Sequence, residues 1–169
     1  MAASPTIRSL LLAAIVVGLM AMPARGGAQD APGACDAASG PYAVVQIDTQ
    51  PRIDLELART SQEHERGLMF RDDLPPNSGM LFVYTFAARE SYWMFNTLIP
   101  LSIAFIDRDG TIVDIHDMAR LDDPSNESEA ARSVYPSAAP YWYALEVNSG
   151  WFLDHGVGVG QQIAFCLGS

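Results

Sequence analysis

Five side chains in the second half of the chain could bind a ligand, because they combine an indole with amide, hydroxyl and carboxylate groups: Trp93, Asn96, Thr97, Glu146 and Asn148. The indole offers a flat apolar face, and the polar groups donate or accept hydrogen bonds. Asn96 and Thr97 interrupt a mostly apolar stretch at 91–106, and Glu146 interrupts another at 141–147. The pattern predicts an aromatic and polar site for a small molecule, glycan or peptide. For Asn96 an alternative stays open, a turn residue that bonds its own backbone.

Asp114 and His116 form a second candidate pair. They lie two residues apart in an expected strand, so their side chains project from the same face. A carboxylate and an imidazole can ligate a metal or act as acid and base, yet no histidine in the chain has a partner at metal-ligand spacing. A solvated strand face explains the pair equally. We expect neither a metal nor a cofactor, with Asp114 and His116 as the weak metal candidates.

The elements that must position these residues are mostly strands. Apolar and alternating segments predict about seven or eight short strands, at 42–48, 52–57, 80–86, 91–95, 101–106, 111–117, 141–147 and 162–167. Thr60 and Glu63 have capping-box spacing and predict a helix over 61–69, one of one or two short helices. The fold class is therefore mainly β (β-rich α+β), a single compact antiparallel domain, barrel-like or sandwich-like. The long polar stretch 119–140 is predicted to be a loop that gates the site.

Residues 1–28 have the form of a signal peptide. Arg8 precedes a nearly uniform apolar run at 10–22, which is shorter than the roughly 20 residues that a bilayer span needs, and small residues follow it. Residues 29–41 are rich in Gly, Pro, Ala and Ser and predict a disordered lead-in to a domain at 42–169. We expect an exported chain, periplasmic or secreted, with no stable membrane span after cleavage. The alternative is a chain tethered to the membrane by an uncleaved signal.

The chain is acidic, with 20 Asp and Glu against 10 cationic residues and a net charge of −10. Removal of residues 1–28 would take away Arg8 and Arg25 and bring the charge to −12. Such a surface repels nucleic acids and anionic lipid headgroups, so neither is an expected partner. All the cations are arginines, and the absence of lysine excludes Schiff-base chemistry.

Two cysteines, Cys35 and Cys166, lie near opposite ends of the expected mature chain. A disulfide between them would close a loop of about 130 residues and stabilise the fold by at most about 5 kcal/mol. The alternatives are two unpaired thiols, or a lipidated Cys35 that would tether the chain to a membrane. Neither cysteine has a basic neighbour that would lower its pKa, so a catalytic thiol is not predicted.

Five ordered blocks resemble one family: 67–71 (Gly-Leu-Met-Phe-Arg), 79–82 (Gly-Met-Leu-Phe), 93–101 (Trp-Met-x-Asn-Thr-x-Ile-Pro-Leu), 105–110 (Phe-Ile-Asp-x-Asp-Gly) and 144–151 (Ala-Leu-Glu-Val-Asn-x-Gly-Trp). They are similar to the domain of unknown function 192 family over about residues 43–167. The resemblance implies a small, often exported β-rich domain with no established activity or cofactor. The chain departs from the family pattern at Phe95, where members typically have Lys, and at Ser102, where they typically have Asp.

Together these features favour a non-catalytic binding or accessory module of the cell envelope. The expected site consists of the five residues named first, gated by the 119–140 loop. Two alternatives stay open. One is a hydrolase that uses carboxylates or the pair Asp114 and His116, and the other is a structural partner in an envelope complex.

Overall fold

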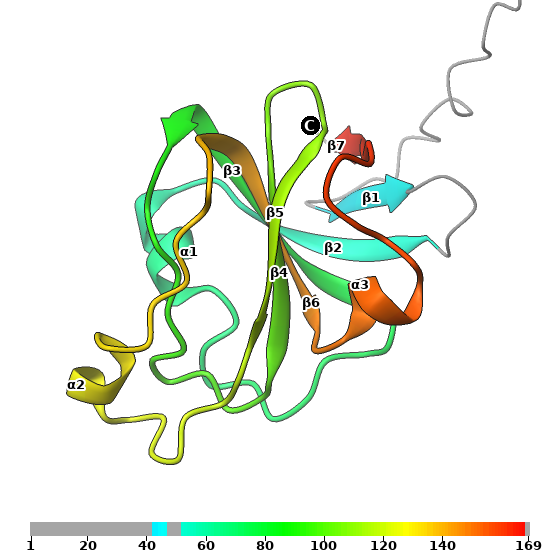
Figure 1. Cartoon of the computed structure of the whole chain (residues 1–169). Helices are drawn as coiled ribbons and strands as arrows, with labels where there is room; N and C mark the ends of the chain where they lie inside the picture. The colour runs from blue at the N-terminus through cyan, green and yellow to red at the C-terminus, as the bar shows by residue number, and fades with distance from the viewer. Residues whose placement is uncertain (1–41, 47–51, 168–169) are drawn as a thin grey trace, which may run out of the picture. The chain divides into compact units, whose positions relative to one another are not determined.

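The computed structural model describes residues 42–46 and 52–167, which belong to the unit Pro32–Ser169 (Figure 1). For 42–46 and 165–167 only the backbone is described. The predicted signal peptide, the lead-in and Cys35 lie outside the described residues, so export and the state of the two cysteines stay predictions. Among the described residues, no helix has the length and apolar character that a bilayer span requires.

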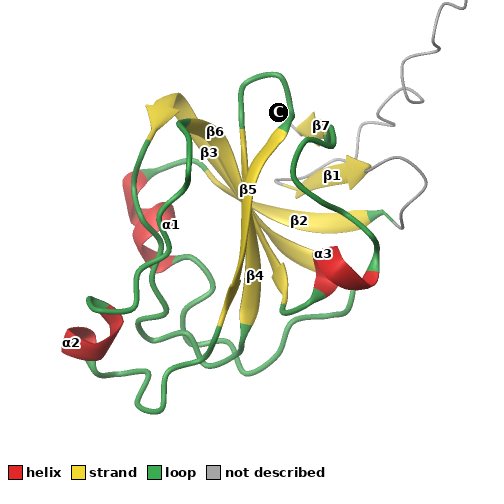
Figure 2. Cartoon of the chain, in the orientation of Figure 1, coloured by secondary structure: helices red, strands yellow, loops and turns green. Residues whose placement is uncertain are grey.

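The described chain contains strands and short helices, which Figure 2 distinguishes by colour. The strands are β1 (Tyr42–Gln46), β2 (Ile53–Ala58), β3 (Ser78–Ala88), β4 (Leu101–Ile106), β5 (Ile112–Met118), β6 (Tyr141–Asn148) and β7 (Ala164–Leu167). The helices are α1 (Ser61–Arg66), α2 (Glu127–Ala130) and α3 (Trp151–Asp154). The predicted mainly β class is therefore confirmed.

Local signals determine where α1 begins and ends. The Thr60 hydroxyl accepts the backbone N–H of Glu63 at 3.3 Å, and the Glu63 carboxylate accepts that of Thr60 at 2.8 Å, which is the predicted capping box. The helix ends at Arg66 rather than at residue 69, because Gly67 adopts a φ of +43° that breaks the helical path. The chain then turns so that Leu68 packs into the core.

One mixed sheet organises the described chain. Its packed part contains five strands in the order β5-β4-β6-β3-β2, fewer than the seven or eight predicted, and β1 and β7 extend it beyond β2 by backbone pairing. β2 and β3 run parallel, whereas the other neighbours are antiparallel. The sheet is not closed, so the predicted antiparallel barrel or sandwich is wrong. Alternating polarity predicts a strand, but it carries no information about strand direction or closure.

Both faces of this sheet are buried. The first, which we call the α3 face, packs strand residues against α3 and the C-terminal segment, and its members include Leu81, Leu145, Trp151, Phe152 and Ile163. The second, which we call the Glu146 face, packs strand residues against connecting segments, and its members include Met80, Phe82, Leu68, Met94, Ile103, Leu121 and Ala130. Burial on both sides explains why every residue of β4 is buried, as its mostly apolar sequence predicts.

Three connecting segments, 67–75, 89–100 and 119–140, cover the Glu146 face and are joined by backbone hydrogen bonds. The N–H of Phe70 donates to the carbonyl of Asn96 at 2.9 Å, and the N–H of Asn96 donates to that of Pro124 at 2.7 Å. Tyr92 and Tyr135 exchange two such bonds, at 2.8 and 3.0 Å. The predicted strand at 91–95 is therefore wrong, because this aromatic segment leaves the sheet to cover it, and only Tyr92 forms a bridge.

Candidate functional site

The structure separates the five predicted site residues. Glu146 and Asn148 lie on β6, whereas Trp93, Asn96 and Thr97 lie on the segments that cover the Glu146 face. Thr97 is only 5% exposed, and its hydroxyl donates to a backbone carbonyl two residues earlier, at 3.3 Å. Thr97 therefore stabilises its own turn and presents no group to a ligand.

Asn96 and Trp93 contribute to the cover in different ways. Asn96 has a φ of +52°, a left-handed conformation that asparagine tolerates, and its backbone joins two of the covering segments. Trp93 is 39% exposed, and its ring centroid lies 5.4 Å from that of Phe95. Neither side chain forms a hydrogen bond within the described part of the chain. Their positions favour a structural role for Asn96 and leave Trp93 as an exposed aromatic.

Glu146 lies in the middle of the Glu146 face. It pairs with Met80 of β3 on one side and with Ile103 of β4 on the other, so apolar side chains flank it in the sheet. The residue is 5% exposed, and its carboxyl group forms no hydrogen bond within the described residues. Burial disfavours the charged form and raises the pKa of Glu146 from 4.5 to about 8. At neutral pH this side chain is therefore an uncharged acid in an apolar environment.

Tyrosine hydroxyls lie near this carboxyl. Tyr84 and Tyr92 form a hydrogen bond with each other at 2.9 Å. Burial raises the pKa of both, and a charge on Glu146 would raise them further. A raised carboxyl pKa next to other titratable groups is typical of an active site, but it also arises wherever an acid is buried for structural reasons. Because Glu146 is only 5% exposed, little of its side chain is accessible to a substrate.

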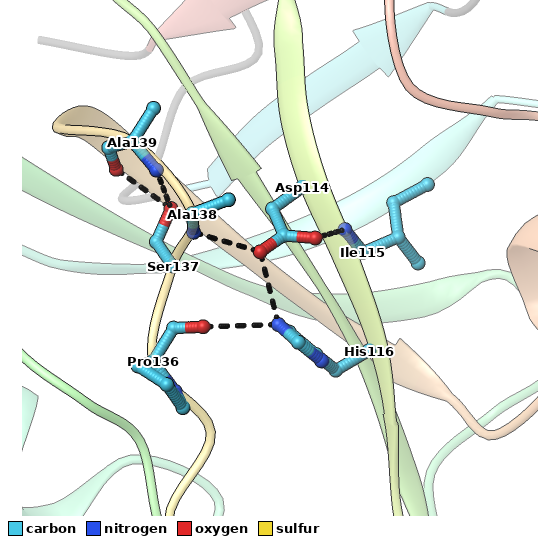
Figure 3. A network of polar contacts seen from close by, with 7 residues as sticks. All are labelled: Asp114, Ile115, His116, Pro136, Ser137, Ala138 and Ala139. Atoms are coloured by element: carbon cyan, nitrogen blue, oxygen red, sulfur yellow. Dashed lines mark hydrogen bonds and ion pairs between the residues drawn. The ribbon is translucent and has the colours of Figure 1, made fainter.

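Asp114 and His116, the weak metal candidates, hold a loop in place (Figure 3). The Asp114 carboxylate accepts the backbone N–H of Ala138 at 2.8 Å and lies 3.1 Å from His116 Nε2. The same nitrogen lies 3.0 Å from the carbonyl of Pro136. Within the described residues no cluster of three His, Cys, Asp or Glu side chains could hold a metal ion. The pair therefore fastens residues 136–138 to β5, which contradicts a freely gating 119–140 loop.

A groove at the end of β6 brings other polar groups together around Asn148. It has a volume of about 520 Å³, and we call it the Asn148 groove. The residues that line it come from the loop before β3, the end of β6 and α3 with the residue that follows it: Leu74, Pro76, Asn77, Asn148, Ser149, Trp151, Asp154 and His155. Asn148 is the one predicted site residue among them.

Three of these side chains are each held by one polar atom and leave the opposite atom without a partner in the described residues. The Asn148 amide nitrogen donates to the carbonyls of Leu74 and Pro75 at 3.1 and 2.9 Å, which leaves its oxygen free. The Asn77 amide oxygen accepts the Trp151 indole N–H at 3.2 Å, which leaves its NH₂ group free. His155 Nδ1 lies 2.7 Å from the backbone carbonyl of residue 151, so it carries the proton, and Nε2 is left free.

Trp151 is the residue that orients two of these groups. It is 4% exposed, its indole N–H holds Asn77, and its ring stacks on the imidazole of His155 at 4.1 Å and 19°. Both orientations are thus determined by a side chain that packs into the α3 face. Fixed hydrogen-bonding groups at the rim of a groove reduce the ordering cost of binding a ligand. The groove is therefore the better-formed candidate site.

Comparisons with known proteins agree with the sequence resemblance. The model of one family, DUF192, described as "Uncharacterized ACR", matches residues 43–165. The chain belongs to the DUF192 family. Among curated proteins, none gave a match.

Two solved structures resemble the DUF192 domain of this chain. One is a Sinorhizobium meliloti protein described as a "putative transcription regulator", with a TM-score of 0.64 and 30% identity, over 73% of this chain and 92% of that one. The other is a protein of unknown function from Novosphingobium aromaticivorans, with a TM-score of 0.61 and 32% identity, over 73% of this chain and 83% of that one. Both structures have a fold similar to that of this chain, and their descriptions name no ligand.

Ser102, one of the two departures from the family pattern, stabilises the turn at Gly150 that precedes the α3 residues of the Asn148 groove. It is fully buried, and its hydroxyl accepts the backbone N–H of Gly150 at 2.8 Å while it donates to the carboxylate of Asp117 on β5. Gly150 has a φ of +80°, which glycine adopts without strain, and it closes the turn between β6 and α3. A serine at 102 thus still anchors the turn that carries the groove, with the carboxylate supplied by the neighbouring strand.

Sequence reasoning missed Asn77 and His155. Asn77 lies in a loop rich in Pro and Ser, and His155 follows a short helical turn, so neither had a motif of its own. Asn77 meets Asn148 because β3 and β6 are antiparallel neighbours, with Gly79 opposite Val147, which places the start of β3 beside the end of β6. His155 reaches the groove by a different route, because it follows α3 and its ring is held on Trp151. Knowledge of that one strand pairing would have brought Asn77 to Asn148, whereas His155 also requires the turn into α3.

Proposed function

We propose that this DUF192 protein is a non-catalytic binding module of the cell envelope that holds a small, neutral, hydroxyl-rich ligand, such as one or two sugar units, in the Asn148 groove. The observation that carries the proposal is the set of three side chains whose outer polar atoms are free while their inner atoms are fixed. They offer one donor from Asn77 and one acceptor each from Asn148 and His155.

Both the groups and the charge of the groove support a neutral ligand. Sugar hydroxyls donate and accept, so they satisfy a mixed set of donors and acceptors. Asp154 lines the groove and the whole chain carries a net charge of −10, which disfavours phosphates and carboxylates. The volume of about 520 Å³ suits a ligand of this size.

Export to the periplasm or the medium is part of the proposal and rests on the signal-peptide form of residues 1–28. The family resemblance, which implies domains that are often exported, supports the same location. Fractionation of cells that express the full chain tests it. Retention of unprocessed chain in the cytoplasm would contradict export without affecting the groove.

The groove is tested by titration of the isotope-labelled protein with three named probes: maltotriose, the N-acetylglucosamine trimer and trialanine. We expect one of the two sugars to shift the NMR signals of the Asn77 and Asn148 side-chain amides and of the Trp151 indole. Asn77→Asp keeps an oxygen that accepts from Trp151, replaces the free NH₂ donor by an acceptor oxygen and adds a negative charge. His155→Asn keeps a donor near the position of Nδ1 and removes Nε2.

Each substitution should weaken binding by about tenfold, as the loss of one hydrogen bond implies, with little change in melting temperature. Asp122→Asn, at an exposed loop position, is the matched control and should bind like the wild type. Unchanged affinity in both groove variants, or shifts confined to other parts of the domain, would refute the site.

A hydrolase is the second candidate, and one observation favours it. His155 has its Nδ1 fixed on a carbonyl and its Nε2 free, as a general base requires, and Ser149 and Asp154 line the same groove. Hydrolysis of p-nitrophenyl acetate is the direct assay. Turnover that exceeds the buffer rate and is lost in His155→Asn would establish the enzyme, whereas equal rates for the two proteins would exclude His155 as a base.

A further inference from the structure

The edge of β3 that faces β2 is only partly occupied. β3 has 11 residues, and β2 pairs with its first five, from Asp54 opposite Ser78 to Ala58 opposite Phe82. After Ala58 the chain enters α1 and leaves the sheet. Among the described residues, no strand pairs with 83–88 on this side, while β6 lies along the other edge (Figure 1).

A hollow of about 370 Å³ lies beside this free edge. Its lining comes from β3, from the residue that follows β2, from α1 and from the loop after β3: Val83, Tyr84, Thr85, Phe86, Arg59, Ser61, His64, Glu65 and Glu90. Residues 85–87 are exposed although they have strand geometry, and Phe86 is 58% exposed. The hollow therefore offers an extended backbone edge together with an accessible aromatic ring.

The wall of the hollow is held by several contacts. His64 Nε2 lies 3.0 Å from the carbonyl of Ala58, and the His64 ring packs on Tyr84 with a centroid distance of 4.6 Å. The Tyr84 ring packs edge-on against Tyr141 at 5.3 Å, and its hydroxyl bonds that of Tyr92. The last residue of β2, α1 and the floor of the hollow are thus tied together. A preformed edge of this kind requires little ordering on binding.

The charge of the hollow is negative. Glu65 and Glu90 form no ion pair in the described part of the chain, whereas Arg59 is already engaged in an interaction. A second copy of this chain that paired through the same edge would bring these glutamates against their equivalents. Like charges at close range disfavour such a pairing, so the charge selects a basic occupant.

We propose that residues 83–88 of β3 bind an extended peptide segment of a partner protein by strand addition, with a basic side chain of that segment against Glu65 and Glu90. Unpaired N–H and C=O groups along a strand edge form hydrogen bonds with another extended backbone. Phe86 supplies an apolar contact for one side chain of the peptide. This interaction surface lies on residues that the Asn148 groove does not use.

The test uses the full chain and a synthetic probe, the acetylated and amidated hexapeptide Arg-Val-Thr-Val-Arg-Val. Two further versions carry N-methyl groups on the odd or on the even residues. Because alternate N–H groups of a strand point to opposite sides, only one version blocks pairing with β3. We expect that version to bind at least about tenfold more weakly and the other to bind like the parent peptide.

Hydrogen exchange locates the complex, because the amides of residues 84–87 should become protected when the parent peptide binds. Phe86→Ser should weaken binding, while Phe70→Ser, at an aromatic that is 60% exposed elsewhere, is the matched control. Glu65→Gln with Glu90→Gln should reduce affinity for the basic peptide about tenfold, as about 1.4 kcal/mol of lost attraction implies. A peptide with Glu in place of both Arg residues should bind more weakly than the parent.

Three results would overturn the proposal. Equal binding of the two N-methylated peptides would show that the backbone edge is not used. Failure of the parent peptide to bind at millimolar concentration would show that the edge is not a peptide site. Concentration-dependent dimerisation that protects residues 84–87 without peptide would show that a second copy occupies the edge instead.

Discussion

Replacement of the buried acid, Glu146→Gln, tests how the Glu146 face tolerates a carboxyl group. Glutamine has nearly the same shape and no charge at any pH. Burial raises the pKa of Glu146 from 4.5 to about 8 in the folded state, whereas the unfolded chain titrates near the ordinary value. The folded protein therefore binds the proton more tightly than the unfolded chain does, and deprotonation opposes folding.

The sign and size of the effect follow from linkage. At about 1.4 kcal/mol per pKa unit, a rise from 4.5 to about 8 corresponds to about 5 kcal/mol of unfolding free energy. This stability is fully present below pH 4.5 and is lost progressively as the pH rises to about 8. About 3 kcal/mol of it is already lost at pH 7. Glu146→Gln removes this dependence, so the variant should match the wild type near pH 4.5 and exceed it by several kcal/mol at pH 9.

Urea unfolding of both proteins between pH 4.5 and pH 9 measures the difference directly. Subtraction of one stability curve from the other cancels the groups that titrate equally in both proteins. The exposed Glu65→Gln is the matched control, and its difference from the wild type should stay flat over this range. A flat difference for Glu146→Gln, or a variant less stable than the wild type at pH 9, would refute the assignment of a buried neutral acid.

Three further substitutions test contacts that hold the domain together. Arg71→Met removes two hydrogen bonds to the Glu56 carboxylate, at 2.5 and 2.7 Å, which lower the pKa of Glu56. Because the pair is partly exposed, the free energy of unfolding measured in urea should fall by about 1 kcal/mol or less at pH 7. This difference from the wild type should vanish as the pH falls below 4.5. Asp114→Ala removes the acceptor of the Ala138 N–H, so hydrogen exchange at Ala138 should accelerate and the free energy of unfolding should fall by about 1–2 kcal/mol. Unchanged exchange would show that residues 136–138 are held by other contacts. Gly79→Ala places a methyl group 2.2 Å from a β6 backbone carbonyl, so it should cost at least about 3 kcal/mol by thermal or urea unfolding, and a wild-type midpoint would contradict the packing of β3 on β6.

Features that depend on neighbouring residues could be predicted from the sequence. The capping box of Thr60 and Glu63 starts α1, and the apolar run at 101–106 is a strand buried at every residue. Gly110 has a φ of +86° in the hairpin turn that Asp109 and Gly110 predict. In each case, the interactions that decide the structure lie within a few residues along the chain.

Features that depend on residues far apart in the chain could not be predicted from the sequence. The segment 91–95 has the composition of a strand because it packs on an apolar face, yet the left-handed Asn96 and the bonds to residues 124 and 135 place it on the cover of the sheet. A segment that covers an apolar face needs the same apolar residues as a strand within the sheet, so composition alone does not separate the two. The parallel pairing of β2 with β3 was missed because alternating polarity predicts a strand without indicating its direction or its neighbour.

The residues of the candidate site also differ in whether neighbouring or distant parts of the chain position them. Asn148 could be named because it directly follows an apolar stretch and belongs to a family block. Its neighbours in the groove could not be named, because the register of β3 on β6 brings Asn77 there and the packing of α3 brings His155 there. Three predicted residues that share the covering segment, Trp93, Asn96 and Thr97, instead joined or covered the core. A polar residue in an apolar run marks a constraint, and only its contacts show whether the constraint is structural or functional.

The two proposed sites lie at opposite ends of one strand, which makes their tests independent. Asn77 directly precedes β3, and Phe86 lies near its far end. Nine residues of strand at about 3.3 Å each separate them by about 30 Å. Substitutions this far apart with no shared contact have additive effects. Asn77→Asp should therefore leave peptide binding unchanged, and Phe86→Ser should leave sugar binding unchanged. Loss of both activities in either variant would mean that β3 itself, and not a local contact, had been disturbed.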